Sequence, residues 1–388
     1  MVVGDMAQRR VGRTGTRQEA AARVSLALQE FGLFEAGSRA RRSPALHRAL
    51  DLMEEQVLDP DRPERELASV LTIDTRHSRP FAPALRLDPK LVPASVRRSF
   101  ADVLKDHANE VTRRRRQALF RKRLDAGERR PVLVAEGDSW FHFPIFLRDV
   151  VQQLGEDHLV WTIGAAGEQL AAMAGADATI GDRDYRLALR EHADSVKAML
   201  LSGGGNDLVG VDPDGARVLS RLLKPYQPGK PADWFCDTPE CHRRLVLIEA
   251  SLRRVFADTA ARHPGLPVLI HGYDYALPCP FGREDARRPS WARRDGFLGA
   301  AMVELGFREA GLRRSIVACL IDAMNAIHRR LAGGTNPGGV FAHVFHIDLR
   351  GSLAPAQWAD ELHPSDEGYA IVADRFRSQL RALGIGRA

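Results

Sequence analysis

The pattern of hydrophobic positions changes near residue 131 of the chain. From there on, short apolar runs typical of buried strands alternate with longer segments of helical periodicity. The strand candidates are Val132–Ala135, Leu159–Ile163, Ala198–Leu201, Pro267–His271 and Val344–Leu349. The helix candidates lie near 145–155, 167–174, 183–194, 242–263, 308–332 and 365–383. This alternation predicts a three-layer α/β domain with a doubly wound, mostly parallel sheet.

The first third of the chain has a different pattern, which predicts a mainly helical N-terminal extension. Residues 20–57 show helical periodicity, and residues 58–95 contain six prolines without a long periodic stretch. Residues 95–124 predict one basic amphipathic helix. The expected division is therefore an extension over 1–125 and the sheet domain over 126–388. Because the helix at 95–124 must bury its apolar face, deleting residues 1–90 should be tolerated better than deleting 1–125.

Charge separates the same two parts of the chain. Residues 1–130 hold 27 Lys and Arg against 18 Asp and Glu, a net +9, whereas the rest holds 29 against 32, a net −3. The densest basic run is formed by Arg113, Arg114, Arg115 and Arg116. Such a run can contact an anionic surface, although we favour the solvated face of a helix beside a domain boundary. No aromatic residues interleave with it as a base-stacking surface requires, so no specific nucleic-acid partner is predicted.

Composition narrows the class of protein and its compartment. Hydrophobic residues make up 44% and charged residues 27% of the 388, which is typical of soluble globular chains. No apolar run approaches the roughly 20 residues that span a bilayer. The four cysteines (Cys236, Cys241, Cys279 and Cys319) are too few for a disulfide scaffold. We expect a cytoplasmic protein with free thiols; the Cys236/Cys241 pair leaves a metal knuckle or a disulfide as alternatives.

Several predicted strands end in polar or glycine-rich turns. The first runs into Gly137-Asp138-Ser139-Trp140, where a serine on a tight strand-to-helix turn can point its hydroxyl out of the sheet. The alternative is that Ser139 only caps the next helix. Because ligands bind at the carboxyl ends of the strands in doubly wound sheets, these turns are candidates for chemistry.

The next two strand ends supply possible hydrogen-bond donors. The second strand leads into a turn with Gly164 and Gly167, where a backbone N–H can approach a ligand closely. The third leads into Gly203-Gly204-Gly205-Asn206-Asp207. The amide of Asn206 is a neutral donor suited to a developing oxyanion, although it can equally satisfy local backbone.

A carboxylate and an imidazole lie three residues apart near the C-terminus, in Asp360-Glu361-Leu362-His363-Pro364. On a turn, Asp360 can hold one ring nitrogen of His363 and leave the other to accept a proton from a serine. A surface pair is the alternative for this spacing taken alone.

Taken together, these blocks resemble the SGNH, or GDSL-like, hydrolase superfamily over about residues 131–383. The resemblance implies a flavodoxin-like sheet with Ser139 as nucleophile and Asp360 and His363 as its partners. It implies an oxyanion hole made by Ser139, Gly167 and Asn206, with Gly164 as the other candidate glycine. It implies no metal and no organic cofactor.

The chain also departs from the superfamily pattern. Trp140 stands where the motif has leucine, and Thr162 stands where many members have asparagine at the start of the second block. The long gap between Asn206 and Asp360 predicts insertions near 210–241 and 278–300 that roof the site. His142, Trp140 and Phe141 can line the pocket or only pack, and the roles of Tyr273 and Asp274 cannot be assigned.

The resemblance favours a serine hydrolase that cleaves a carboxylic ester, whether a lipid, a thioester or an O-acetyl substrate, through an acyl-enzyme. One alternative is a catalytically idle binding module of the same fold, although Ser, His and Asp are all present. The other is a metallophosphoesterase, for which the chain lacks the Asp-x-His and Gly-His-x-His ligand motifs.

Overall fold

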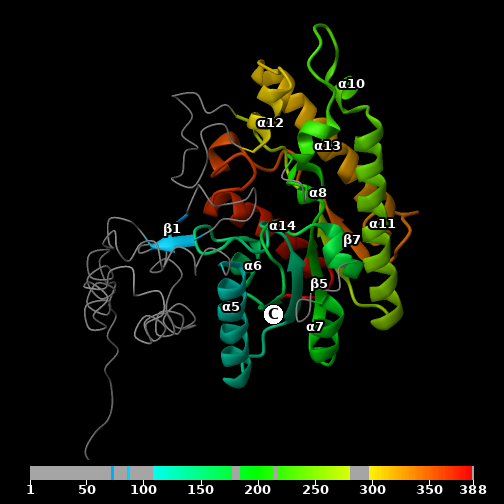
Figure 1. Cartoon of the computed structure of the whole chain (residues 1–388). Coiled ribbons are helices and arrows are strands. Elements are labelled where there is room, and N and C mark those ends of the chain that lie inside the picture. The colour runs from blue at the N-terminus through cyan, green and yellow to red at the C-terminus, as the bar shows by residue number, and fades with distance from the viewer. Residues whose placement is uncertain are drawn as a thin grey trace, which may run out of the picture.

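The structure is a computed structural model of the chain and describes residues 71–73, 85–87, 108–176, 184–212, 216–279 and 297–386 (Figure 1). The helix predicted over 20–57 lies outside the described residues. So do the N-terminal part of the helix predicted over 95–124 and most of the predicted insertion at 278–300.

A five-stranded parallel sheet forms the centre of the molecule. Its strands are β3 (Val132–Gly137), β4 (Leu159–Thr162), β5 (Val196–Ser202), β6 (Val268–His271) and β7 (Val344–Ile347). They lie in the order β4-β3-β5-β6-β7, and every neighbouring pair is parallel. This is the flavodoxin-like order, in which the winding direction reverses beside the first strand. The predicted fold class and all five predicted strands are confirmed.

The strands are mostly apolar along their whole length because helices cover both faces of the sheet. All six residues of β3 and all four of β4 and β6 are buried. On one face, α6 (Val150–Leu154) packs against α14 (Asp366–Ala382). On the other, α11 (Pro239–Arg262) packs against α13 (Ala310–Leu331) (Figure 1).

The helix α7 (Tyr185–Glu191) belongs to the same face as α11. The hydroxyl of Tyr185 donates to Asp258 of α11 at 2.9 Å, and the guanidinium of Arg186 pairs with the same carboxylate at 3.1 Å. The helix start is capped by Asp184, whose side chain accepts from the N–H of Arg186. Each face of the sheet is thus covered by helices that contact one another as well as the strands.

Two predicted helices differ from the expectation for local reasons. The helix expected from residue 145 begins only at Val150, because Pro144 and the left-handed backbone of Ile145 (φ 65°) precede it. The helix expected over 167–174 is a short π-helical segment, Ala172–Ala176, with a non-helical glycine inside it. Both differences lie in turns that follow strands.

Short helices gather at the carboxyl ends of the strands: α8 (Gly205–Val209), α9 (Val218–Leu222), α10 (Ala232–Cys236) and α12 (Leu298–Glu304) (Figure 1). The helix α8 follows β5 directly, whereas α9 and α10 come from the segment in which the sequence predicts an insertion.

The helix α5 (Ala108–Asp125) covers the edge strand β4 and carries the arginine run. Arg113, Arg115 and Arg116 are only 4–8% exposed, and of the four arginines only Arg114 lies at the surface. This corrects both interpretations of the run, as an anionic contact and as a solvated face, because each requires guanidinium groups in water.

A short antiparallel pair, β1 (Leu71–Ile73) and β2 (Leu85–Leu87), precedes α5. None of the helices in the described part of the chain is both long and apolar enough to pass through a bilayer.

Candidate active site

Ser139 lies on the turn that follows β3 and is 2% exposed. Its Oγ is 2.9 Å from Nε2 of His363, although 224 residues separate the two in sequence. The turn is held in place by the neighbouring strand, because the N–H of Asp138 donates to the carbonyl of Ser202 at the end of β5. The reversal of winding beside β3 leaves room above this turn for a ligand.

The segment before α14 brings Asp360 against His363. The Asp360 carboxylate lies 2.8 and 3.0 Å from Nδ1 of the imidazole, and it also accepts the N–H groups of Leu362 and His363 at 2.8 Å. Burial alone would raise the pKa of Asp360, but the adjacent imidazole and these hydrogen bonds hold it below its usual value. The carboxylate therefore stays ionised and fixes one nitrogen of the ring while the other faces Ser139.

Trp140 ties these two segments together. Its indole N–H donates to the carbonyl of Leu362 at 3.0 Å, and its ring stacks on His271 at 5.2 Å between centroids. Edge-on contacts with Tyr273, Trp358 and Tyr369 surround the rest of the ring. The tryptophan that departs from the motif thus fixes the spacing between Ser139 and His363 by packing.

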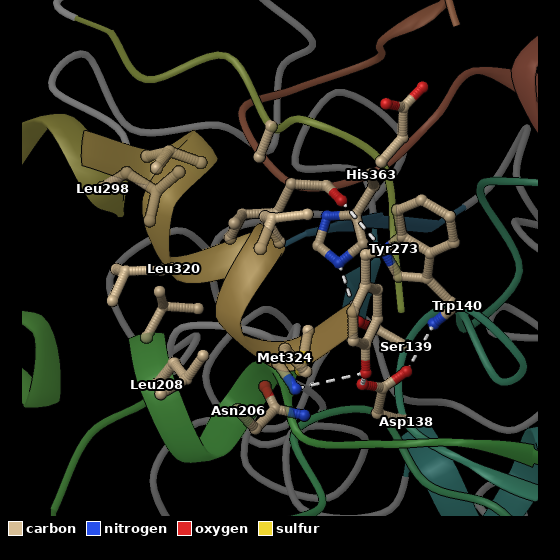
Figure 2. Close-up of a pocket in the computed structure, with 17 residues that line it drawn as sticks. Asp138, Ser139, Trp140, Asn206, Leu208, Tyr273, Leu298, Leu320, Met324 and His363 are labelled. Carbon is tan, nitrogen blue, oxygen red and sulfur yellow. Dashed lines mark hydrogen bonds between the residues drawn. The ribbon is translucent and has the colours of Figure 1, made fainter. Parts of the chain in front are cut away.

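Asn206 is the second residue of α8 and lies at the Ser139 end of the cavity (Figure 2). Its side-chain nitrogen donates to the carbonyl of Glu168 at 2.8 Å, while Oδ1 is buried without a partner among the described residues. This bond uses one of the two N–H groups of the amide, and the other N–H does not take part in it. A second link joins the same two turns, since Asp207 accepts the N–H of Leu170 at 3.0 Å.

The two candidate glycines occupy different environments. A Cβ on Gly164 would lie 2.3 Å from the carbonyl oxygen of Gly137, so this residue is glycine because two strand ends approach closely. Gly167 has φ 87°, a left-handed conformation that favours glycine, and it directly precedes the Glu168 that binds Asn206. Neither glycine lines the cavity described below.

A buried polar network beneath Ser139 was not anticipated from the sequence. The Tyr273 hydroxyl donates to Asp138 and accepts the N–H of Gly205 at 3.2 Å. Asp138 also accepts from the Ser202 hydroxyl at 2.8 Å, and that hydroxyl lies 2.9 Å from Nε2 of His271. Burial raises the pKa of Asp138, while its hydrogen bonds act to lower it. The available signal was that Ser202 and His271 are polar residues at the last positions of apolar strands.

Helix α5 supports this region from the side. The Asn109 side chain makes two hydrogen bonds, of 3.0 and 3.1 Å, to the backbone of Ala166, next to Gly167. The Arg116 guanidinium donates to two carbonyls of the turn after Ser139 and lies 2.8 Å from the buried carboxylate of Asp149. Burial raises the pKa of Asp149 to about 6, although Arg116 acts to lower it.

A cavity opens beside Ser139 and His363 and extends away from the sheet between α8, α12 and α13 (Figure 2). Its polar end contains Asp138, Ser139, Asn206, Tyr273 and His363. Beyond these, its wall is formed mainly by aliphatic side chains, with one further carboxylate, Asp274. The Ser139–His363 pair and a largely apolar cavity therefore share one site.

The other candidates lie away from this cavity. His142 contacts the backbone carbonyl of Asn109 at 3.0 Å and packs beneath α5. All four cysteines are unbridged. Within the described ranges, no three His, Cys, Asp or Glu side chains are grouped so that they could hold a metal ion.

Comparison with known proteins gives remote similarity only. No protein-family model matches the chain, and no curated protein matches it. Among solved structures, an extracellular lipase from Streptomyces rimosus is 14% identical, with 64% of this chain and 99% of that one covered and a TM-score of 0.38. The phospholipase A1 from Streptomyces albidoflavus is 12% identical at the same coverage, with a TM-score of 0.36.

A protein from Parabacteroides merdae described as GDSL-like is 14% identical, with 66% of this chain and 97% of that one covered and a TM-score of 0.28. Its description names the superfamily that the motif blocks of this chain resemble. At such TM-scores the likeness does not decide what this chain does.

Proposed function

We propose that the protein is a serine hydrolase that cleaves carboxylic esters through an acyl-enzyme. The observation that carries this proposal is the chain of contacts from Ser139 Oγ to His363 Nε2 at 2.9 Å and from His363 Nδ1 to Asp360 at 2.8 Å. Nucleophilic acyl transfer uses a hydroxyl, an imidazole and a buried carboxylate that contact one another in this order.

In the proposed first step, Ser139 Oγ attacks the ester carbonyl and His363 Nε2 takes its proton. The C–O bond to the alcohol then breaks, and His363 returns the proton to the departing alkoxide. Asp360 holds Nδ1–H throughout and stabilises the imidazolium. In the second half, His363 removes a proton from water and the resulting hydroxide attacks the acyl carbonyl. The bond to Ser139 Oγ then breaks, His363 returns the proton to that oxygen, and the carboxylic acid is released.

The negative charge of each tetrahedral intermediate needs donors. We assign the backbone N–H groups of Ser139 and Gly167 and the side-chain nitrogen of Asn206 to this role. The hydrogen bond from Asn206 to the carbonyl of Glu168 supports the assignment, because it keeps the amide beside the turn that carries Gly167. Each such preorganised donor contributes on the order of 10²–10³ in kcat.

The test is covalent labelling combined with substitution. A fluorophosphonate should modify Ser139, identified by peptide mapping, and Ser139→Ala should lower p-nitrophenyl acetate hydrolysis by about 10³-fold or more. Ser195→Ala, which removes a serine hydroxyl that donates to the local carbonyl of His192, is the matched control. Retention of more than about a tenth of the activity in Ser139→Ala would remove the basis of the proposal. EDTA should leave the rate unchanged; a rate restored by Mn²⁺ or Zn²⁺ would favour a metallophosphoesterase instead.

A further inference from the structure

The wall of the cavity is contributed by helices that are far apart in sequence. Its apolar side chains include Leu208 of α8, Leu298 of α12, and Val317, Leu320, Ile321 and Met324 of α13. Five of them are at most 4% exposed although they line an open space, so they face the cavity and not bulk solvent (Figure 2). An empty apolar space of this kind favours an apolar occupant.

The two carboxylates of the lining, Asp138 and Asp274, are already engaged by hydrogen-bond donors. Asp138 is occupied by Tyr273, Ser202 and the N–H of Trp140. Asp274 accepts three backbone N–H groups, from Tyr275, Gly351 and Leu353, at 2.6–2.7 Å. No Lys or Arg is among the described residues that line the cavity. Among these described residues, a buried anionic group would find no basic side chain as counter-ion, and burying a charge without one is costly.

The wall is also preorganised, because a buried carboxylate anchors α12. Glu361, which lies between Asp360 and His363, accepts the backbone N–H groups of Cys279, Phe297, Leu298 and Gly299. Burial raises the pKa of Glu361 to about 7, and these four N–H groups act to lower it. The residue that follows Asp360 thereby fixes the position of Leu298 in the wall.

We propose that this cavity binds the acyl group of the substrate and that this group is an uncharged aliphatic chain longer than acetyl. The inference rests on the proposed function, since it places the ester carbonyl at Ser139 and the acyl chain between α8, α12 and α13. Each methylene transferred from water into such a wall can raise kcat/KM by up to about fourfold. The chemistry thus favours esters of medium-chain fatty acids over acetate esters.

The experiment is a series of p-nitrophenyl esters from acetate to decanoate on the full chain, with fluorophosphonate labelling of Ser139 as an independent measure of the active serine. We expect kcat/KM to rise at least tenfold from acetate to hexanoate. The heptanoate should exceed the mono-p-nitrophenyl adipate, whose acyl chain ends in a carboxylate, by about 100-fold or more.

Substitutions in the wall test where the chain lies. Leu320→Trp should lower the ratio of octanoate to acetate kcat/KM at least tenfold, and Leu320→Ala should move the preferred length to longer chains. Leu312→Trp is the matched control, because Leu312 is half-buried on the same helix and does not line the cavity. The two Leu320 variants change the wall in opposite directions, so the test survives if one of them fails to fold.

The outcomes separate the two proposals. Two results would overturn the acyl assignment while leaving the proposed ester hydrolase intact. In both, Ser139 is labelled; in the first, kcat/KM stays flat or falls with chain length, and in the second, the adipate ester is hydrolysed as well as the heptanoate ester. A shift of equal size in Leu312→Trp also overturns it. Absence of both labelling and hydrolysis of every ester overturns the proposed function and this inference with it.

Discussion

The two ends of the cavity are built in opposite ways. The polar end consists of turns that follow strands and of the segment before α14, and its groups are fixed by short hydrogen bonds, such as those between Asp360 and His363. The apolar end consists of single side chains from three helices, held in place by packing and by the anchor at Glu361. The proposed chemistry therefore depends on a few hydrogen bonds of defined geometry. The proposed preference for acyl chain length depends on the shape of the apolar wall as a whole.

The difference has an energetic side. Removing one donor or acceptor from the polar end leaves a buried polar group unsatisfied, at a cost of about 1–3 kcal/mol. Changing one side chain of the apolar wall alters the volume available to an acyl chain while the other side chains remain. Variants at the polar end should thus change the rate on every ester, and variants at the apolar end should change which ester is preferred.

The largest effect should come from removing the support of the polar end. We propose that α5, which lies before the boundary expected near residue 126, is part of the unit that carries the site. Deleting residues 1–125 removes Arg116 and leaves the buried carboxylate of Asp149 without its ion pair, which costs about 3–5 kcal/mol. That is comparable with the whole stability of a domain. Deleting residues 1–90 keeps α5 and should be tolerated better. Soluble yield, melting temperature and esterase activity of both truncated chains measure this, and equal behaviour would show that α5 is dispensable.

Next in size is the loss of Asn206, the side chain that we propose as an oxyanion donor. Asn206→Ala should lower kcat by roughly 10²–10³ on acetate and octanoate alike, with a smaller change in KM. Asn336→Ala, at an exposed cap on the carbonyl of Arg329, serves as the control. An effect confined to KM, or to one chain length, would assign Asn206 to the apolar end instead.

A smaller effect is expected from the network beneath Ser139. Tyr273→Phe removes the donor to Asp138 and the acceptor for Gly205, which should destabilise the fold by about 1–3 kcal/mol and lower kcat by up to about tenfold. Losing this donor raises the pKa of Asp138 further. The loss of stability should therefore grow as pH rises, because only the ionised carboxylate needs the donor.

Melting curves of Tyr273→Phe and the parent protein between pH 5 and 8 measure this trend. Tyr275→Phe is the matched control, since its hydroxyl binds Asp322 nearer the surface. A loss that is constant with pH would mean that Tyr273 acts on Ser139 only by packing.

The smallest change in acetate hydrolysis should come from a substitution of Glu361, which anchors α12 in the wall of the cavity. Glu361→Gln replaces one acceptor oxygen by an NH₂ group that faces backbone donors, so the start of α12 should loosen. We expect the octanoate-to-acetate ratio to fall several-fold while acetate hydrolysis changes less. Glu304→Gln, at the exposed end of α12, is the control. Equal losses on both esters would show that Glu361 acts through its neighbours Asp360 and His363.

Local sequence patterns predict the strands and the polar turns beside them. Five buried strands such as Val132–Gly137 are visible as apolar runs, because both faces of a parallel sheet are covered. Ser139, Asn206 and His363 could be grouped in advance, since the carboxyl ends of parallel strands converge on one edge. Their roles in catalysis stay predictions until the variants are measured.

Other features depend on contacts between residues that are far apart in the chain. The sequence does not predict the burial of Arg113, Arg115 and Arg116. A run of arginines has the same sequence pattern whether its side chains face water or pack against the rest of the protein. The link from Tyr273 to Asp138 joins residues 135 positions apart, and the wall that includes Leu208 and Leu320 joins helices more than 100 positions apart. Local patterns encode strands and turns, but a cavity wall exists only where distant side chains pack around the same space.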